Sequence, residues 1–181
     1  MKATGIVRRI DDLGRIVIPK EIRRNMHIRE GSPLEIFTNR DGEIILKKYS
    51  PIGELADFAK EYAEAISETL SKPVLIADRD SIVAVSGAPK KDFLGKSVGH
   101  MVERSMSERC PFVTDQPDHG SIVAEDRGEP TYRFNSELVM PIISQGDPIG
   151  AVVVCGADGL EEADRKVAQS AAGVLARQML Q

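Results

Sequence analysis

Six basic side chains between residues 8 and 24 are spaced in a way that suits contact with a polyanion. Duplex DNA is a line of negative charge, and a protein binds it by placing cationic groups against the phosphates and releasing counterions. Arginine also carries a bidentate fork that reads guanine O6 and N7 in the major groove. Ordinary solvated surface charge is the alternative for any one of these residues, but it explains the whole set poorly. We therefore predict that double-stranded DNA is contacted by Arg8, Arg9, Arg15, Lys20, Arg23 and Arg24.

The first of these side chains are predicted to lie on a β-hairpin. The β-branched runs Ile6-Val7 and Ile16-Val17-Ile18 flank Asp11-Asp12-Leu13-Gly14, whose residue types favour a turn. Side chains alternate along a strand, so Arg8 and Arg9 are expected on opposite faces.

A helix and a second hairpin are predicted to follow. Pro19 opens the helix, because the N–H that proline lacks would have no partner at the first helical position. The second hairpin joins the runs at 34–37 and 44–46 through Asp41-Gly42, a strong hairpin signal. The order is therefore β-β-α-β-β. At 100° per residue, one face of the helix is basic and carries Lys20, Arg23, Arg24 and His27.

Positive charge is confined to the first part of the chain. Residues 1–50 contain 11 Lys and Arg against 7 Asp and Glu, a net charge of +4, whereas residues 51–181 contain 13 against 21, a net charge of −8. This split predicts that only the first part meets a polyanion. The absence of Trp argues against a base-stacking surface for single strands. Fifty residues without cysteine are few for a closed core, so oligomerisation is predicted to complete it.

The first fifty residues resemble the DNA-binding domain of AbrB-type transition-state regulators, which has a swapped-hairpin fold. The resemblance rests on Gly5-Ile-Val-Arg-Arg9, on Asp11-x-Leu-Gly-Arg-Ile-Val-Ile-Pro19, on Glu21-Ile-Arg-Arg24, on Leu34-Glu-Ile36 and on Ile44-Ile-Leu-Lys-Lys-Tyr49. It implies that two copies interleave their hairpins in one dimeric barrel. It also implies that the positions in direct contact with DNA are Arg8, Arg15, Arg23 and Arg24, with Arg9 and Lys20 ranked second.

The rest of the chain is predicted to be α+β, with an antiparallel sheet and flanking helices. After Pro51 the apolar period changes from two to 3.6, which predicts a connecting helix within residues 51–72. A last helix over about residues 160–180 begins near Asp158 and Glu161, which are spaced as a variant capping box. Both helices are able to share one side of the sheet. Between them, a short helix is expected over about 100–107 and strands over about 74–77, 82–85, 122–124, 137–143 and 149–155.

Residues 73–181 resemble a GAF domain, a small-molecule sensor fold, through Pro148-Ile-Gly-Ala-Val-Val-Val154 followed by Leu160-Glu-Glu-Ala-Asp164. The resemblance implies dimerisation through the terminal helices, and hence a homotetramer with two DNA-binding units. A ligand of such a fold would sit between the sheet and the loops over it, here residues 87–133. The residues that would line this pocket, or equally fill a closed core, are Phe93, Met101, Cys110, Phe112 and Tyr132.

Catalytic and metal-binding patterns do not stand out. His100, Cys110 and His119, with Asp115 and Asp118, lack the spacing of a metal-ligand set. Cys155 lies in an apolar run and is predicted to be a small buried hydrophobe. We therefore predict no metal, no cofactor and no enzymatic activity.

The predicted function is that of a sequence-selective, homo-oligomeric transcription regulator in the cytoplasm, associated with the nucleoid and without a membrane segment. The whole chain resembles sporulation regulators of spore-forming Bacillus relatives, which implies activation and repression of genes in the forespore. Two alternatives stay open. An antitoxin-like interaction protein would use a related swapped-hairpin fold, but a folded C-terminal domain speaks against it. An enzyme built on the GAF-like part would need a catalytic constellation.

Overall fold

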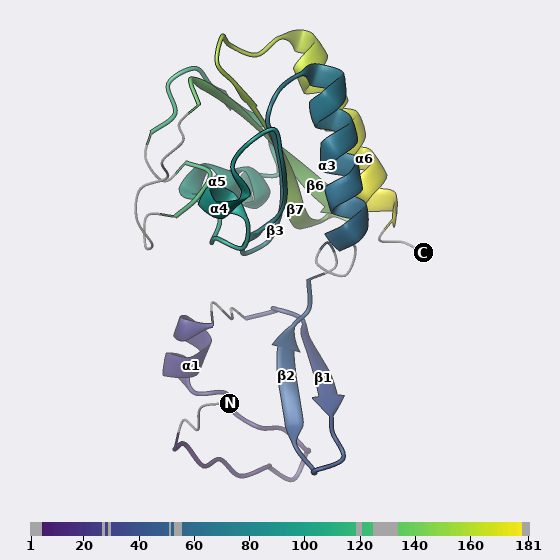
Figure 1. Cartoon of the computed structure of the whole chain (residues 1–181). Coiled ribbons are helices and arrows are strands. Elements are labelled where there is room, and N and C mark those ends of the chain that lie inside the picture. The colour runs from purple at the N-terminus through teal and green to yellow at the C-terminus, as the bar shows by residue number, and fades with distance from the viewer. Residues whose placement is uncertain are drawn as a thin grey trace. The chain divides into compact units, whose positions relative to one another are not determined.

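The computed structural model describes residues 5–26, 28, 30–50, 52, 56–118, 121–124 and 134–178. The chain divides into two compact units, Met1–Tyr49 and Ser50–Gln181, called here the N-terminal and the C-terminal unit (Figure 1).

The N-terminal unit contains a short helix and an antiparallel strand pair. α1 spans Lys20–Asn25, and Pro19 lies immediately before it, so the helix begins one residue later than predicted. β1 (Leu34–Thr38) pairs with β2 (Ile44–Lys48). The predicted helix and second hairpin are therefore confirmed.

The first predicted hairpin is present as a turn, but not as a strand pair within one chain. The Gly14 N–H donates to the Asp11 carbonyl, and the Asp11 N–H donates to the Arg15 carbonyl, both at 3.0 Å. Residues 6–10 and 16–18, however, form no β-ladder with their own chain. β-Branched residues favour strands, and an extended segment that is not paired in its own chain is a template for pairing with another chain. In a swapped hairpin that partner belongs to a second copy.

Five antiparallel strands in the order β4-β3-β7-β6-β5 form the sheet of the C-terminal unit. β7 is central, and its long register with β6 pairs Cys155 with Glu137. The strands span Val74–Asp78 (β3), Ile82–Ser86 (β4), Phe112–Thr114 (β5), Ser136–Ser144 (β6) and Asp147–Gly156 (β7).

The strand prediction was right for β3, β4, β6 and β7 and wrong in two places. β5 was not predicted, because it is short and is held in the sheet by its pairing with β6. The strand predicted at 122–124 is a single bridge between Val98 and Val123. The backbone there bonds to the start of a helix instead, since the carbonyls of Ser121 and Ile122 accept the N–H groups of Met101 and Gly99.

Helices cover both faces of this sheet (Figure 1). α3 (Ala56–Leu70) and α6 (Glu162–Gln178) pack on one face, which confirms that the terminal helices share one side. α4 (Lys90–Phe93) and α5 (His100–Glu108) pack on the other face.

Alternate strand residues therefore enter two separate cores. On β3, Val74 and Ile76 belong to the core under α3 and α6, whereas Leu75 and Ala77 belong to the core under α4 and α5. Because both faces are covered, β3 is buried along its whole length and reads as a continuous apolar run.

The start of α6 corrects the predicted capping pair. Asp158 and Glu161 were expected to form it, but the Glu161 N–H donates to Asp164 Oδ2 at 2.7 Å, and Glu162 is the first helical residue. Gly159 has φ +91°, a left-handed conformation that keeps the helix from beginning earlier. Lys72 Nζ lies 2.6 Å from the same Asp164 oxygen and joins the end of α3 to the start of α6.

The first residues of the C-terminal unit are anchored to its sheet. Ser50 Oγ donates to Asp78 Oδ2 at 2.7 Å. Ile52 is 1% exposed and packs where a side chain on Gly150 would otherwise stand, since a Cβ added there would lie 2.6 Å from Ile52 Cδ1. Residues 50 and 52 are therefore structural parts of this unit.

Candidate nucleic-acid interface

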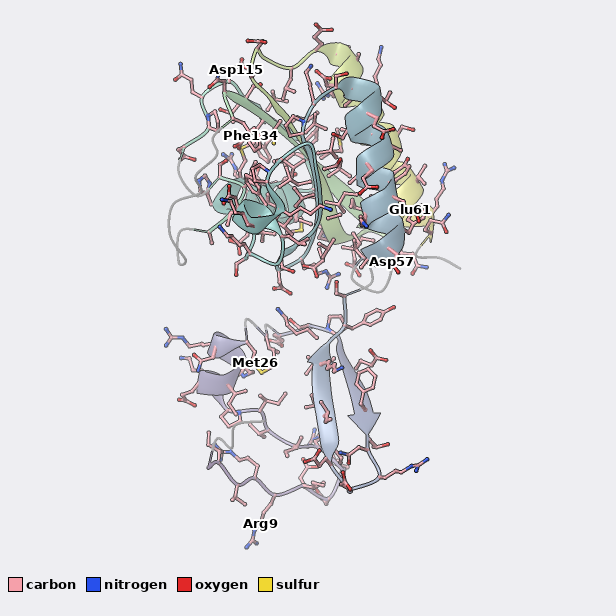
Figure 2. The ribbon with its side chains drawn as sticks, viewed as in Figure 1. Arg9, Met26, Asp57, Glu61, Asp115 and Phe134 are labelled. Carbon is pink, nitrogen blue, oxygen red and sulfur yellow. The ribbon has the colours of Figure 1, made fainter. Side chains whose placement is uncertain are left out.

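All six predicted DNA-binding residues lie in the N-terminal unit, and all are exposed. Arg8 and Arg9 precede the first turn, and Figure 2 shows Arg9 pointing away from the ribbon. Arg15 follows this turn, and Lys20 lies at the start of α1. Arg23 and Arg24 lie further along the same helix.

α1 gathers three of these cations on one side. Arg23 and Arg24 follow Lys20 by three and four residues, which places all three on the same face of the helix. Ile22 lies on the opposite face and is half-buried. The predicted basic face is thus present at these three positions and is exposed to solvent. His27, which was also assigned to this face, lies outside the described residues.

The first turn fixes the position of Arg15. Asp11 Oδ1 accepts the N–H groups of Leu13 (3.0 Å) and Arg15 (2.7 Å), and Asp11 Oδ2 accepts the Nε–H of Arg15 (2.9 Å). The backbone N–H of Arg15 is the main reason that the pKa of Asp11 lies below its usual value. Asp11 therefore stays ionised and holds the guanidinium by one nitrogen. This role of Asp11 was not predicted from the sequence.

A single copy of the N-terminal unit leaves most of its large apolar side chains in solvent. Val7 is 90% exposed, Val17 70% and Leu13 69%. Among the described residues of this unit, Pro19 alone is buried. Burial of apolar surface is the main force that stabilises a folded domain. Further exposed apolar side chains are Ile6, Ile10, Ile16, Met26, Ile36, Phe37, Ile44 and Tyr49.

The residues predicted to line a ligand pocket are spread between core and surface. Phe93 is the last residue of α4 and is buried, and its ring stacks on that of Phe134 with centroids 5.6 Å apart. Figure 2 shows Phe134 among the side chains within the C-terminal unit. Met101 is half-buried beside the same core. Phe93 thus has the packing that the closed-core alternative predicts.

The other predicted pocket residues lie further out. Phe112 on β5 is half-buried, and the guanidinium of Arg104 lies 4.5 Å above its ring. Cys110 is exposed. Tyr132 lies outside the described residues, so its place relative to this set stays a prediction.

The polar residues weighed as metal ligands do not converge. In the described part of the chain, no group of three His, Cys, Asp or Glu side chains is placed to hold a metal ion. His100 Nε2 and Asp118 Oδ1 form an exposed pair at 2.9 Å, and His119 lies outside the described residues. Cys110 and Cys155 are both free, and Cys155 is a buried small hydrophobe, as predicted.

Glu137 is a buried carboxyl group that was not predicted from the sequence. It lies on β6, accepts a hydrogen bond from Ser121 Oγ and faces Cys155 across the strand pair. Burial raises its pKa to about 7, and the Asp118 carboxylate adds to the rise, while Ser121 and His100 oppose it. Burial also raises the pKa of the Cys155 thiol.

Because of Glu137, we expect the fold to lose stability as the pH rises. The folded chain binds the Glu137 proton more tightly than the unfolded chain, so its contribution is complete below pH 4.5 and is lost as the pH approaches 7. The free energy of unfolding should fall by roughly 3 kcal/mol over this pH range. In urea denaturation, the free energy of unfolding of Glu137→Gln should change less with pH. This variant should be the more stable form at pH 8. Glu61→Gln on the surface of α3 is the control (Figure 2). An unchanged slope in Glu137→Gln would contradict the assignment.

None of the helices in the described part of the chain has the length and apolar character needed to cross a bilayer.

The chain is similar to known proteins over its whole length. Residues 54–180 match the family described as stage V sporulation protein T C-terminal, transcription factor. Over 185 residues the chain is 56% identical to stage V sporulation protein T of Bacillus subtilis (strain 168), and the match covers 100% of both proteins. The chain belongs to the stage V sporulation protein T family. This family is one of transcription factors, which confirms the predicted DNA-binding regulator of sporulation and shows that the chain is not an enzyme.

Each unit also has relatives beyond the stage V sporulation protein T family. Residues 7–54 match the family described as antidote-toxin recognition MazE, bacterial antitoxin. The transition state regulatory protein AbrB of B. subtilis is 52% identical over 63 residues, 32% of this chain and 65% of AbrB. The fold of the C-terminal unit is similar to that of the GAF domain from an Acinetobacter phosphoenolpyruvate-protein phosphotransferase. That match has a TM-score of 0.58 and 14% identity and covers 70% of this chain and 82% of the other. Both predicted folds are therefore confirmed.

Proposed function

We propose that two copies of this chain pair their N-terminal segments into one barrel that binds duplex DNA in a sequence-selective way. Arg8, Arg15, Arg23 and Arg24 contact the DNA, and Arg9 and Lys20 flank them. The proposed domains are residues 1–50 for DNA binding, 51–72 as a connecting helix and 73–181 as the GAF-like domain, with the boundary residue Ser50 bonded to Asp78 of the C-terminal unit.

One observation carries this proposal: the segment that exposes the arginines also exposes its apolar side chains. Val7 and Val17 lie on runs that form no ladder in one chain. A second copy would supply the missing strands and the missing core together. The net charge of +4 on residues 1–50 then doubles on one assembled surface, where it favours a polyanion.

The fuller assembly is a homotetramer in the cytoplasm, at the nucleoid of the forespore. The C-terminal units pair through α3 and α6, so that two DNA-binding barrels belong to one particle. A small effector bound on the α4–α5 side would act through the connecting helix to activate or repress. Native mass spectrometry of the full chain counts the subunits and detects retained small molecules, and a monomer without DNA affinity would contradict this assembly.

The test of the proposed function is selection of duplexes from a random pool by the full chain. We expect one recognisable sequence class, bound more tightly as a duplex than as either single strand. The logarithm of its affinity should fall linearly with the logarithm of salt concentration, by about 0.9 per neutralised phosphate. Recovery of random sequences, or a preference for single strands, would contradict sequence-selective duplex binding.

An antitoxin-like interaction protein is the second candidate, because residues 7–54 match the MazE family. In that case the chain would copurify with a toxin, and its C-terminal part would mask it. The folded sheet of Ser50–Gln181 opposes this function, because antitoxin tails of the MazE kind are short segments that fold on their partner. Stoichiometric recovery of a toxin from native purification would favour it.

A further inference from the structure

The two turns of the N-terminal unit are built alike. In the first, Asp11 Oδ1 accepts the N–H groups two and four residues later, those of Leu13 and Arg15. In the second, Asn39 Oδ1 accepts the N–H groups of Asp41 (3.1 Å) and Glu43 (2.9 Å) in the same way.

The resemblance extends to the backbone and to the fifth residue. Gly14 and Gly42 have φ +75° and +80°, and each N–H donates to the carbonyl three residues earlier. In both turns the first side chain also bonds to the side chain four residues later. Arg15 Nε donates to Asp11 Oδ2 at 2.9 Å, and Asn39 Nδ2 donates to Glu43 Oε2 at 2.7 Å.

This comparison separates two tasks of Asp11. Asn39 shows that an amide oxygen is sufficient to hold the turn, so the turn does not need a carboxylate. The carboxylate adds an ion pair with Arg15. The Asp11 side chain is 39% exposed and the Arg15 side chain 69%. Ion pairs at such exposure contribute little to stability. Stability of the fold therefore does not explain why Asp11 and Arg15 form this ion pair.

The geometry leaves Arg15 restrained but available. Asp11 takes the Nε–H, so the two terminal nitrogens of the guanidinium remain as a fork that matches guanine O6 and N7. Restraint before binding reduces the side-chain entropy lost on contact. The carboxylate is also repelled by phosphates, which disfavours the use of this arginine as a non-specific backbone contact.

We propose that Asp11 is a positioning residue that gives Arg15 its sequence specificity, by aiming its terminal nitrogens at a base edge and by opposing contact with phosphate. The inference rests on the proposed function, in which Arg15 contacts DNA. Asp11 itself need not touch the DNA.

The test compares full-chain variants on two duplexes, the selected site and an unrelated sequence of equal length. Asp11→Asn keeps the turn, as Asn39 does, and loses the acceptor for Arg15 Nε. We expect it to lower the ratio of specific to non-specific affinity about tenfold. Affinity for the unrelated duplex should stay the same or rise. Asp12→Asn removes the same charge from an exposed neighbour that takes no part in the hydrogen bonds of this turn, and should leave the ratio unchanged.

Variants of Arg15 distinguish a failure of the positioning role of Asp11 from a failure of the proposed DNA contact of Arg15. Arg15→Ala should lower the ratio as well, and adding Asp11→Asn to it should have no further effect. Arg15→Lys keeps Asp11 and the charge but not the fork, and should behave like Asp11→Asn. If Arg15→Ala lowers the ratio while Asp11→Asn and Arg15→Lys do not, the positioning role is wrong. If Arg15→Ala leaves the ratio unchanged, the proposed DNA contact of Arg15 is wrong instead.

Discussion

Replacing Arg8, Arg15, Arg23 and Arg24 with alanine is expected to abolish specific DNA binding by the full chain and leave both units folded. Each base-reading arginine should contribute roughly 1–3 kcal/mol, and each phosphate contact about one unit of salt slope. All four side chains are exposed, so their removal opens no cavity. Fluorescence anisotropy with a labelled site should show an affinity loss of at least about a thousandfold.

A variant with the same loss of charge provides the control for this prediction. Lys60, Lys90, Lys91 and Lys166 are exposed cations of the C-terminal unit. Replacing these four with alanine changes the net charge equally but leaves the N-terminal surface intact. Only a modest, salt-dependent loss of affinity is expected. Equal losses in the two variants would show that overall charge, and not the arginine surface, governs binding.

Substitution of Val7 by aspartate is expected to disrupt the paired N-terminal units. In a monomer this side chain is 90% exposed, and the change should alter the free energy of unfolding by less than about 0.5 kcal/mol. If a second copy covers Val7, an unpaired carboxylate is buried and the cost is several kcal/mol. Sedimentation should then show a lost subunit contact, and specific DNA binding should disappear with it.

Leu94 offers a control for the aspartate substitution. It is 47% exposed on the C-terminal unit, so Leu94→Asp adds the same charge at an apolar surface position outside the N-terminal segment. Subunit contacts through residues 1–50 and DNA affinity should remain. Wild-type sedimentation and DNA binding by Val7→Asp would mean that the N-terminal segment does not use this surface for pairing.

Local patterns in the sequence were sufficient to predict most of the fold. The long strands β6 and β7 carry continuous apolar runs, and α3 and α6 carry stripes at helical spacing, so periodicity identifies them. β5 could not be found in this way. It has three residues, and its pairing with β6 brings together segments far apart in the sequence. Such pairing depends on tertiary structure, which local propensity does not contain.

The residues of the candidate site were predicted from their types, but only some of the contacts among them could be predicted from the sequence. The cationic set was visible as a list of side chains, and the turn at residues 11–14 as a local signal. The Asp11–Arg15 pair could have been suspected, since the pattern D-x-x-G-R at 11–15 is repeated as N-x-x-G-E at 39–43. The buried state of Glu137 had no such signal, because Ser121 and His100, which interact with it, are remote in sequence.

Hydrogen exchange of the full chain, free and with its selected duplex, tests most directly whether paired N-terminal segments form the DNA-binding surface. Residues 7–10 and 16–18 form no ladder within one chain, so their amides should exchange freely in a monomer. Pairing predicts strong protection of these amides that is lost on dilution, and further protection around Arg8, Arg15 and α1 when the duplex is added. Free exchange at all concentrations, or DNA-induced protection confined to the C-terminal unit, would contradict the account.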